Sequence, residues 1–182
     1  RLCLAGFFHD TTERNRAERL EALSCEVLRI LNDPRAAPNA TQRILDAIHR
    51  ETGIEAVGIR IRQGEDFPYA AAQGFSSAFI RAENSLAMRT PEGSFCLDDQ
   101  GNVRLECTCG LVLTGGTDPS NPLFTLGGSA WTNDAEPLIE APADADPRLN
   151  LRNRCIHEGF RSVALIPIRV EGEIVGLLQL ND

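Results

Sequence analysis

Four cysteines are the residues whose type and spacing bear most directly on chemistry. Cys107 and Cys109 are two positions apart, so both thiols would face one side of a strand, but they would diverge on a helix or turn. With two more cysteines they make four soft ligands, the number that a closed zinc or iron–sulfur site requires. The usual C-x2-C spacing is missing, and free cysteines are among the residues most often buried. A metal or redox site and inert buried thiols are the alternatives for Cys96, Cys107, Cys109 and Cys155.

A second group of residues could wall a ligand pocket. Trp131 is the only tryptophan, and it follows Gly127 and Gly128, where the backbone can approach a ligand closely. An aromatic ring in such a place can cover a flat ligand, although it can equally belong to the core. The candidate pocket residues are Phe124, Ser129, Trp131, Arg154 and His157.

Cationic side chains cluster around Cys155. His157 could be an axial haem ligand or a hydrogen-bond donor to an anionic effector, or a surface histidine. Arg152, Arg154 and Arg161 could lower the pKa of the Cys155 thiol or bind a carboxylate or phosphate, but solvated helix faces carry such arginines too. The cofactor is left open between haem, a cysteine-bound metal and none.

Sequence signatures of the common active sites are missing. The chain contains no G-x-x-x-x-G-K-[ST] phosphate loop, no H-E-x-x-H and no kinase catalytic box with its glycines. We therefore predict no complete active site in these 182 residues.

These candidates lie in or beside a long middle section, residues 85–149, which is rich in Gly, Pro, Asp and Thr. Within it, residues 95–97 and 103–105 flank a turn and predict a hairpin inserted in a loop. Loops of this length in compact domains are usually functional. We expect the ligand site here.

Two helices precede this section. Residues 11–31 lack Gly and Pro, begin after a capping Asp or Thr and stop before Pro34. Asn39 and Gln42 are spaced as a capping box that opens a second helix, residues 39–52, which ends at Gly53. The first helix carries an a/d seam that predicts either a homodimer or packing on its own domain: Leu20, Leu23, Val27 and Ile30.

The remaining elements are mostly strands. Val57, Ile59 and Ile61 alternate with Gly58, Arg60 and Arg62, which predicts a strand with one wet face. Further strands are expected at residues 67–73, 162–170 and 174–180, and helices at 75–84 and 148–158. The last two strands are apolar and joined by a tight turn, so we expect a hairpin at the centre of a sheet, buried on both faces.

Composition limits the class of protein. A length of 182 residues with 42% hydrophobic content suits one domain with an attachment. A net charge of -8 argues against nucleic acid as a partner. No window is apolar enough to cross a bilayer, so we expect no membrane contact by this chain. Six cysteines in a chain of this length indicate reduced thiols and a cytoplasmic location.

The start of the chain resembles the end of a PAS domain. The stretch GFFHDTTERNRAER, residues 6–19, is similar to the last strand and exit helix through which PAS domains lead into the next signalling module. The resemblance implies a PAS tail at residues 1–12 and a linker or signalling helix at 13–35. We therefore expect the chain to be part of a longer protein.

The rest, residues 36–182, resembles a GAF domain. The matching stretches are ILDAIHRETGIEAVGIRI and GFRSVALIPIRVEGEIVGLLQLND, in which Pro167 and Gly176 fall where that family has them. The resemblance implies an α+β fold: a six-stranded antiparallel sheet with helices on one face, a ligand cavity on the other and a long helix in front.

The middle section resembles GAF domains of multi-domain sensor histidine kinases, some of which carry haem or sense redox state through cysteine. Ala87 stands where that subtype has a cysteine, and Cys96 follows nine residues later, which counts against a four-cysteine centre. The resemblance implies a sensory module for a small-molecule or redox effector, with a downstream kinase or other output domain in the same chain and a phosphorelay as pathway. Alternatives are a module of a cyclic-di-GMP synthase or phosphodiesterase, and a cysteine-based methionine sulfoxide reductase.

Overall fold

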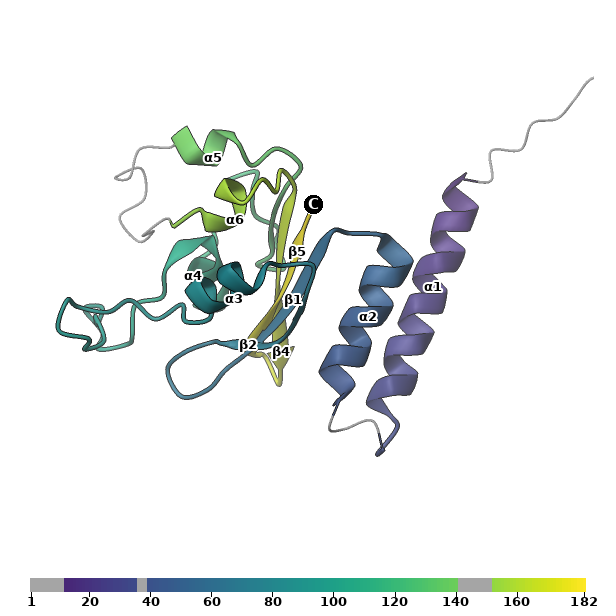
Figure 1. The fold of residues 1–182 in the computed structure, drawn as a ribbon, viewed down its shortest axis with the longest axis horizontal. Coiled ribbons are helices and arrows are strands. Elements are labelled where there is room, and N and C mark those ends of the chain that lie inside the picture. Colours follow the sequence, from purple (N-terminus) through teal and green to yellow (C-terminus); the bar gives the residue numbers. More distant parts are fainter. Residues whose placement is uncertain (1–11, 36–38, 141–151) are drawn as a thin grey trace, which may run out of the picture.

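The computed structural model describes residues 12–35, 39–140 and 152–182. Figure 1 shows a helical hairpin beside a twisted sheet whose opposite side carries short helices and long loops. In chain order the elements are α1 (Thr12–Leu31), α2 (Ala40–Thr52), β1 (Ala56–Ile61), β2 (Tyr69–Gln73), α3 (Ser77–Glu83), α4 (Cys107–Leu113), β3 (Ala130–Thr132), α5 (Pro137–Glu140), α6 (Arg154–His157), β4 (Val163–Val170) and β5 (Glu173–Asn181).

The sheet is antiparallel and has the strand order β2-β1-β5-β4-β3. The predicted hairpin of the last two strands is confirmed, with β5 at the centre between β1 and β4. The described residues form five sheet strands where six were expected. The predicted insert at 95–105 makes only isolated bridges, among them Leu97 with Val103, so it stands apart from the sheet as a narrow loop.

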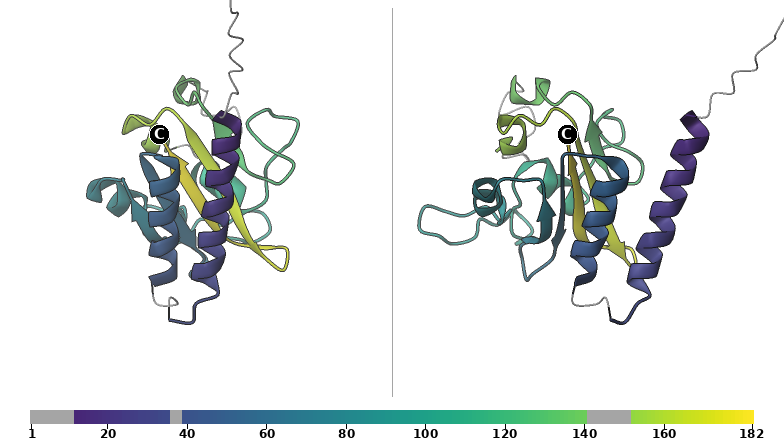
Figure 2. Two further views of the ribbon diagram at one scale, coloured as in Figure 1. Left: turned by 90° about the vertical axis from the view of Figure 1, so that its right-hand side faces the viewer. Right: turned by 45° about the vertical axis from the view of Figure 1, so that its right-hand side comes forward.

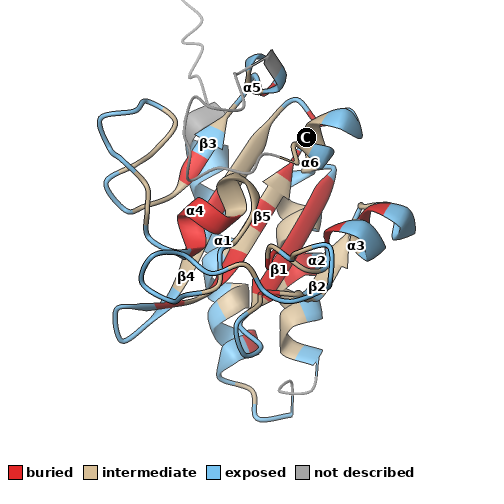
Figure 3. Ribbon diagram, turned by 90° about the vertical axis from the view of Figure 1, so that its left-hand side faces the viewer, coloured by how far each residue is buried: buried red, intermediate tan, exposed pale blue. Residues whose placement is uncertain are grey.

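Both faces of the sheet are covered. Alternate side chains of the strands face α2 on one side, where Leu45 packs on Val57 and Ile59. On the other side, Leu165 and Leu177 pack with residues of α4 and the middle section. Figure 3 shows this second side, with buried residues along β1, β5 and α4. The middle section therefore contributes to the hydrophobic core on this side of the sheet in addition to forming long loops.

The helical hairpin occupies the outer side of the sheet. Figure 2 shows α1 beside α2 in both views, and an ion pair between Glu26 and Arg50 links the two helices. In the predicted seam, Leu23 and Val27 are half-buried and Ile30 is buried, whereas Leu20 is 53% exposed. Most of the seam thus packs within the chain.

Two local predictions differ from the structure. The predicted capping box is not formed: Asn39 is the N-cap of α2 but makes no side-chain cap bond, and the side-chain amide of Gln42 donates to Asp46. Of the predicted helix 148–158, only residues 152–158 are described, and among these the helix is the single turn of α6, preceded by Asn153 with a positive φ of 47°. Gly53 ends α2 as expected, with a left-handed φ of 71°.

Residues 1–11 of the predicted PAS tail lie outside the described residues. None of the helices described in the structure is both long and apolar enough to cross a membrane.

Gly176 lies where β5 is paired on both sides, opposite Ile61 and Ile168. A Cβ atom there would lie 2.4 Å from the carbonyl oxygen of Arg60, closer than real contacts allow. We expect Gly176→Ala to lower the free energy of unfolding by about 1–3 kcal/mol in urea titrations. Gly127→Ala is the control, because its Cβ would meet only a hydroxyl at 3.7 Å. Equal stability of the two variants would contradict this packing.

Candidate functional site

A cavity of about 300 Å³ lies between the sheet and the covering segments. Its floor comes from all five strands of the sheet, and its walls come from α3, α4, α5, α6 and the loop before β3. The volume is at the lower end of the range of small-molecule pockets. Most of the lining is apolar: Phe79, Leu111, Leu123, Phe124, Val163 and Leu165.

Arg60 brings a buried positive charge to the floor of this cavity. Its side chain is on β1 and the residue is 1% exposed. The guanidinium donates to the backbone carbonyls of Phe67 at 3.0 Å, Asn84 at 3.3 Å and Glu83 at 2.7 Å. Two of these carbonyls belong to the C-terminal end of α3, where the helix dipole favours a cation. Arg60 was predicted on a wet face of the strand, and this prediction was wrong because the middle section covers that face.

Tyr69 covers the guanidinium of Arg60. The Cζ atom of Arg60 lies 3.7 Å from the centre of the tyrosine ring, a cation–π contact. Gly58, two residues before Arg60, leaves room for the ring, because a Cβ there would lie 2.7 Å from Cε1 of Tyr69. The hydroxyl of Tyr69 donates to Gln179 at 2.8 Å, and burial raises the pKa of Tyr69. The phenol is therefore a neutral donor at neutral pH.

The carboxylate of Glu83 is directed away from Arg60. It pairs with Arg152 at 3.4 Å, and Arg152 also pairs with Glu106 at 3.3 Å. The backbone N–H of Arg152 donates to the sulfur of Cys107 at 3.0 Å. This network joins the end of α3, the start of α4 and the segment before α6, and so closes one wall of the cavity.

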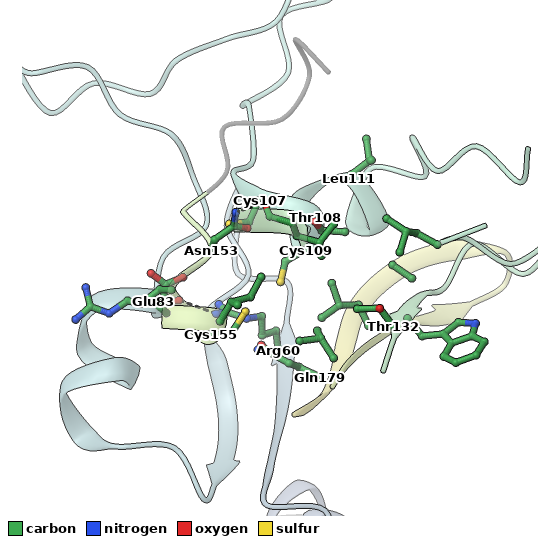
Figure 4. A pocket seen from close by; sticks show the side chains of 18 of the residues that line it. Arg60, Glu83, Cys107, Thr108, Cys109, Leu111, Thr132, Asn153, Cys155 and Gln179 are labelled. Atoms are coloured by element: carbon green, nitrogen blue, oxygen red, sulfur yellow. Dashed lines mark hydrogen bonds between the residues drawn. The ribbon is translucent and has the colours of Figure 1, made fainter. Parts of the chain in front are cut away.

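Three cysteines line the cavity: Cys107, Cys109 and Cys155. Figure 4 shows them with Arg60 and Gln179 around the same space. Burial raises the pKa of Cys109 to about 12 and that of Cys155 to about 11, and it raises the pKa of Cys107 as well. The thiols are therefore protonated at neutral pH, in contrast to the suggestion that the neighbouring arginines lower the pKa of Cys155.

The predicted site residues divide into two groups. Trp131, Phe124 and Arg154 line the cavity together with the three cysteines just described. Ser129, His157 and Cys96 are outside the lining. The backbone of Cys96 pairs with Met88 and Arg104 in the 95–105 insert.

A metal centre does not fit these residues. Within residues 12–35, 39–140 and 152–182, no group of three or more His, Cys, Asp or Glu side chains is arranged to hold a metal ion. Cys107 and Cys109 stand on the first turn of α4, where side chains two apart diverge.

The sequence reasoning missed Arg60, Tyr69, Glu83 and Gln179 as cavity residues. A signal was present at Gly58 and Arg60, which share one face of a strand. A glycine beside an arginine in a strand interior marks a close approach by another group.

Comparison with known proteins gives the fold. No protein-family model and no curated protein matches the sequence. The structure is similar to a GAF domain of A. aeolicus nlh2 in an inactive state, with 14% identity, 92% of this chain and 80% of that chain covered and a TM-score of 0.56. For the GAF domain of a Coxiella burnetii phosphoenolpyruvate-protein phosphotransferase the identity is 17%, the coverage 92% and 79% and the TM-score 0.54.

A third similar structure is the free methionine-R-sulfoxide reductase of Neisseria meningitidis in complex with its substrate. It is 14% identical, 99% of this chain and 80% of that chain are covered, and the TM-score is 0.50. The chain thus has the fold of a GAF domain, as the sequence resemblance predicted. At these low sequence identities the similarity establishes the fold but not the ligand.

The protonated state of the cavity thiols can be tested by alkylation. Because the thiolate reacts, we expect iodoacetamide at pH 7.5 to modify Cys109 and Cys155 at least about tenfold more slowly than the exposed Cys25. Peptide mass mapping gives each rate, and unfolding in urea should make the rates equal. Cavity thiols that react as fast as Cys25 in the folded protein would contradict the raised pKa values.

Proposed function

We propose that this chain is a sensory ligand-binding module of a signal-transduction protein, and that its effector is a small molecule bound in the cavity above Arg60. The observation that carries the proposal is a largely apolar pocket with a buried charged group on its floor. Such pockets, with few polar groups among apolar walls, are typical of small-molecule sites.

The fold supplies a route from this cavity to α1. On β1, Arg60 faces the cavity, while Val57 and Ile59 face α2 on the other side of the same strand. α2 in turn packs against α1. An effector with different affinity for two positions of β1 would shift the equilibrium between two positions of the helical hairpin. Helix α1 would then transmit the signal along the chain.

We propose as output a histidine kinase in a phosphorelay, located in the cytoplasm, with a cyclic-di-GMP synthase or phosphodiesterase as the alternative. The support is the sequence resemblance: a PAS tail at residues 1–12, a signalling helix at 13–35 and the GAF domain at 36–182. The effector is a small molecule rather than haem or a metal. Three observations favour this choice: the cavity volume of about 300 Å³, the position of His157 outside the lining, and the lack of a metal-holding group of side chains among the described residues.

A reductase acting on methionine sulfoxide is the second candidate. Two observations favour it, the three cysteines in the cavity and the likeness to a reductase structure. The raised thiol pKa values argue against it, because a nucleophilic cysteine needs a thiolate. Fast alkylation of Cys109 or Cys155 would favour this candidate over the sensor.

Blocking the cavity tests the sensor proposal. In thermal unfolding with a panel of acidic, neutral and zwitterionic metabolites, the effector should raise the Tm of the wild type by several degrees. Leu123→Trp, which fills the cavity, should lose this increase. Leu97→Trp should keep it, because Leu97 is 57% exposed and outside the cavity lining. An equal increase in both variants would contradict binding in this cavity, and so would a panel without any stabilising compound.

We also propose a homodimer through α1. Leu20, Leu28 and Leu31 are 53%, 58% and 62% exposed, and their spacing of eight and three places them on one helix face. We expect the double variant Leu20→Ser, Leu28→Ser to weaken the dimer at least about tenfold in light scattering. Leu97→Ser is the control on an exposed leucine elsewhere. A double variant that dimerises as the wild type does would contradict the proposal.

A further inference from the structure

The hydrogen-bonding capacity of Arg60 is incompletely used. A guanidinium has five N–H donors, and three bonds to carbonyls use three of them. The Nε atom is buried and has no partner within the described part of the chain. An unsatisfied donor on a charged group is costly in an apolar surrounding, so a ligand that accepts from Nε removes a penalty as well as making a bond.

The positive charge of Arg60 also lacks a direct counter-ion. Among residues 12–35, 39–140 and 152–182, no carboxylate lies within ion-pair distance of its guanidinium. Glu83 binds Arg60 through its backbone carbonyl only, and its carboxylate pairs with Arg152. The partners of Arg60 in this structure are neutral, namely three carbonyls and the face of Tyr69.

Two polar groups, Arg60 and Gln179, lie on the strand side of the cavity, while its other polar side chains come from the covering segments and from β2 and β3. Arg60 is on β1, and Gln179 is on the adjacent strand β5, where it pairs with Gly58, two residues before Arg60. Figure 4 shows both side chains at the opposite end of the cavity from Leu111. The space above them is bounded mainly by aromatic and aliphatic side chains. At about 300 Å³ it equals the volume of ~10 liquid water molecules, which limits the ligand to a compact shape.

We propose that the effector is a small organic acid, with a compact aromatic or branched aliphatic body and a single carboxylate that accepts a hydrogen bond from Nε of Arg60. This inference rests on the proposed function and names its ligand class. The carboxylate supplies both the missing acceptor and the missing negative charge, and the apolar body fills the remaining space. A single carboxylate is expected, because Arg154, the second cation of the lining, already pairs with Glu158 at 3.9 Å.

Calorimetric titration of the wild-type chain tests the ligand class without any substitution. The probes are phenylacetate and 4-methylpentanoate, each compared with its own primary amide, which has the same shape and no charge. We expect the acids to bind at least about tenfold more tightly than the amides, the effect of one charge-assisted hydrogen bond. Equal affinity of acid and amide would overturn the ligand class and leave the proposed function standing.

Substitutions at Arg60 test whether this residue causes the preference for the acid over its amide. Arg60→Met should abolish the preference for the acid, and Arg60→Lys, which keeps a charge and loses Nε, should retain part of it. Arg62→Met is the matched control: Arg62 directly follows the same strand, is exposed, also donates to a backbone carbonyl and does not line the cavity. Circular dichroism establishes that each variant is folded. An undiminished preference in a folded Arg60→Met would overturn the inference.

Failure of the proposed ligand class can be distinguished from failure of the proposed sensory function. If neither acid binds at millimolar concentration, the ligand class is overturned. The proposed function is then judged by the thermal panel, which includes neutral and zwitterionic compounds and depends on the Leu123 and Leu97 variants instead of on Arg60.

Discussion

The burial of one charged side chain, Arg60, is the constraint on which the rest of the site depends. Removing a guanidinium from water is costly, and the fold offsets the cost with three carbonyl bonds and the face of Tyr69. These partners come from the β1–β2 connection, β2 and the end of α3, so one residue fixes the position of three segments. A glycine at position 58 makes the stack of Tyr69 on Arg60 feasible.

The same strand links the two halves of the molecule. On β1, Arg60 faces the cavity, while Val57 and Ile59 on the other face belong to the apolar cluster with Leu45 of α2, as the two-residue period of a strand requires. A ligand that shifts the backbone of β1 at Arg60 would act on Val57 and Ile59, which pack with Leu45 of α2. Leu45 of α2 has no exposed surface, so the packing between α2 and β1 is close. A small displacement of β1 would therefore be transmitted to α2.

The sequence predicted the scaffold better than the site. The end of α2 at Gly53 and the central hairpin of β4 and β5 follow from local patterns, and the structure confirms both. The burial of Arg60 could not be deduced from the alternation of apolar and polar residues along β1. Such alternation defines the two faces of a strand but does not show whether other segments cover the polar face. The segment that covers the Arg60 face is residues 85–140, and it contacts strands that are distant from it in the sequence. The cysteines show the same limit: the sequence shows their number and spacing, whereas the helical conformation at Cys107 and Cys109 and the burial that keeps the thiols protonated depend on the fold.

The central claim is that Arg60 is the anion-binding group of this cavity, and the NMR signal of its Nε–H group tests the claim most directly. The signal is assigned by its loss in Arg60→Lys and followed during titration with phenylacetate. The account predicts that it shifts downfield and exchanges more slowly with water as the carboxylate binds, while the Nε–H signal of Arg62 stays in place. Binding of phenylacetate that leaves the Arg60 signal unchanged would contradict the account.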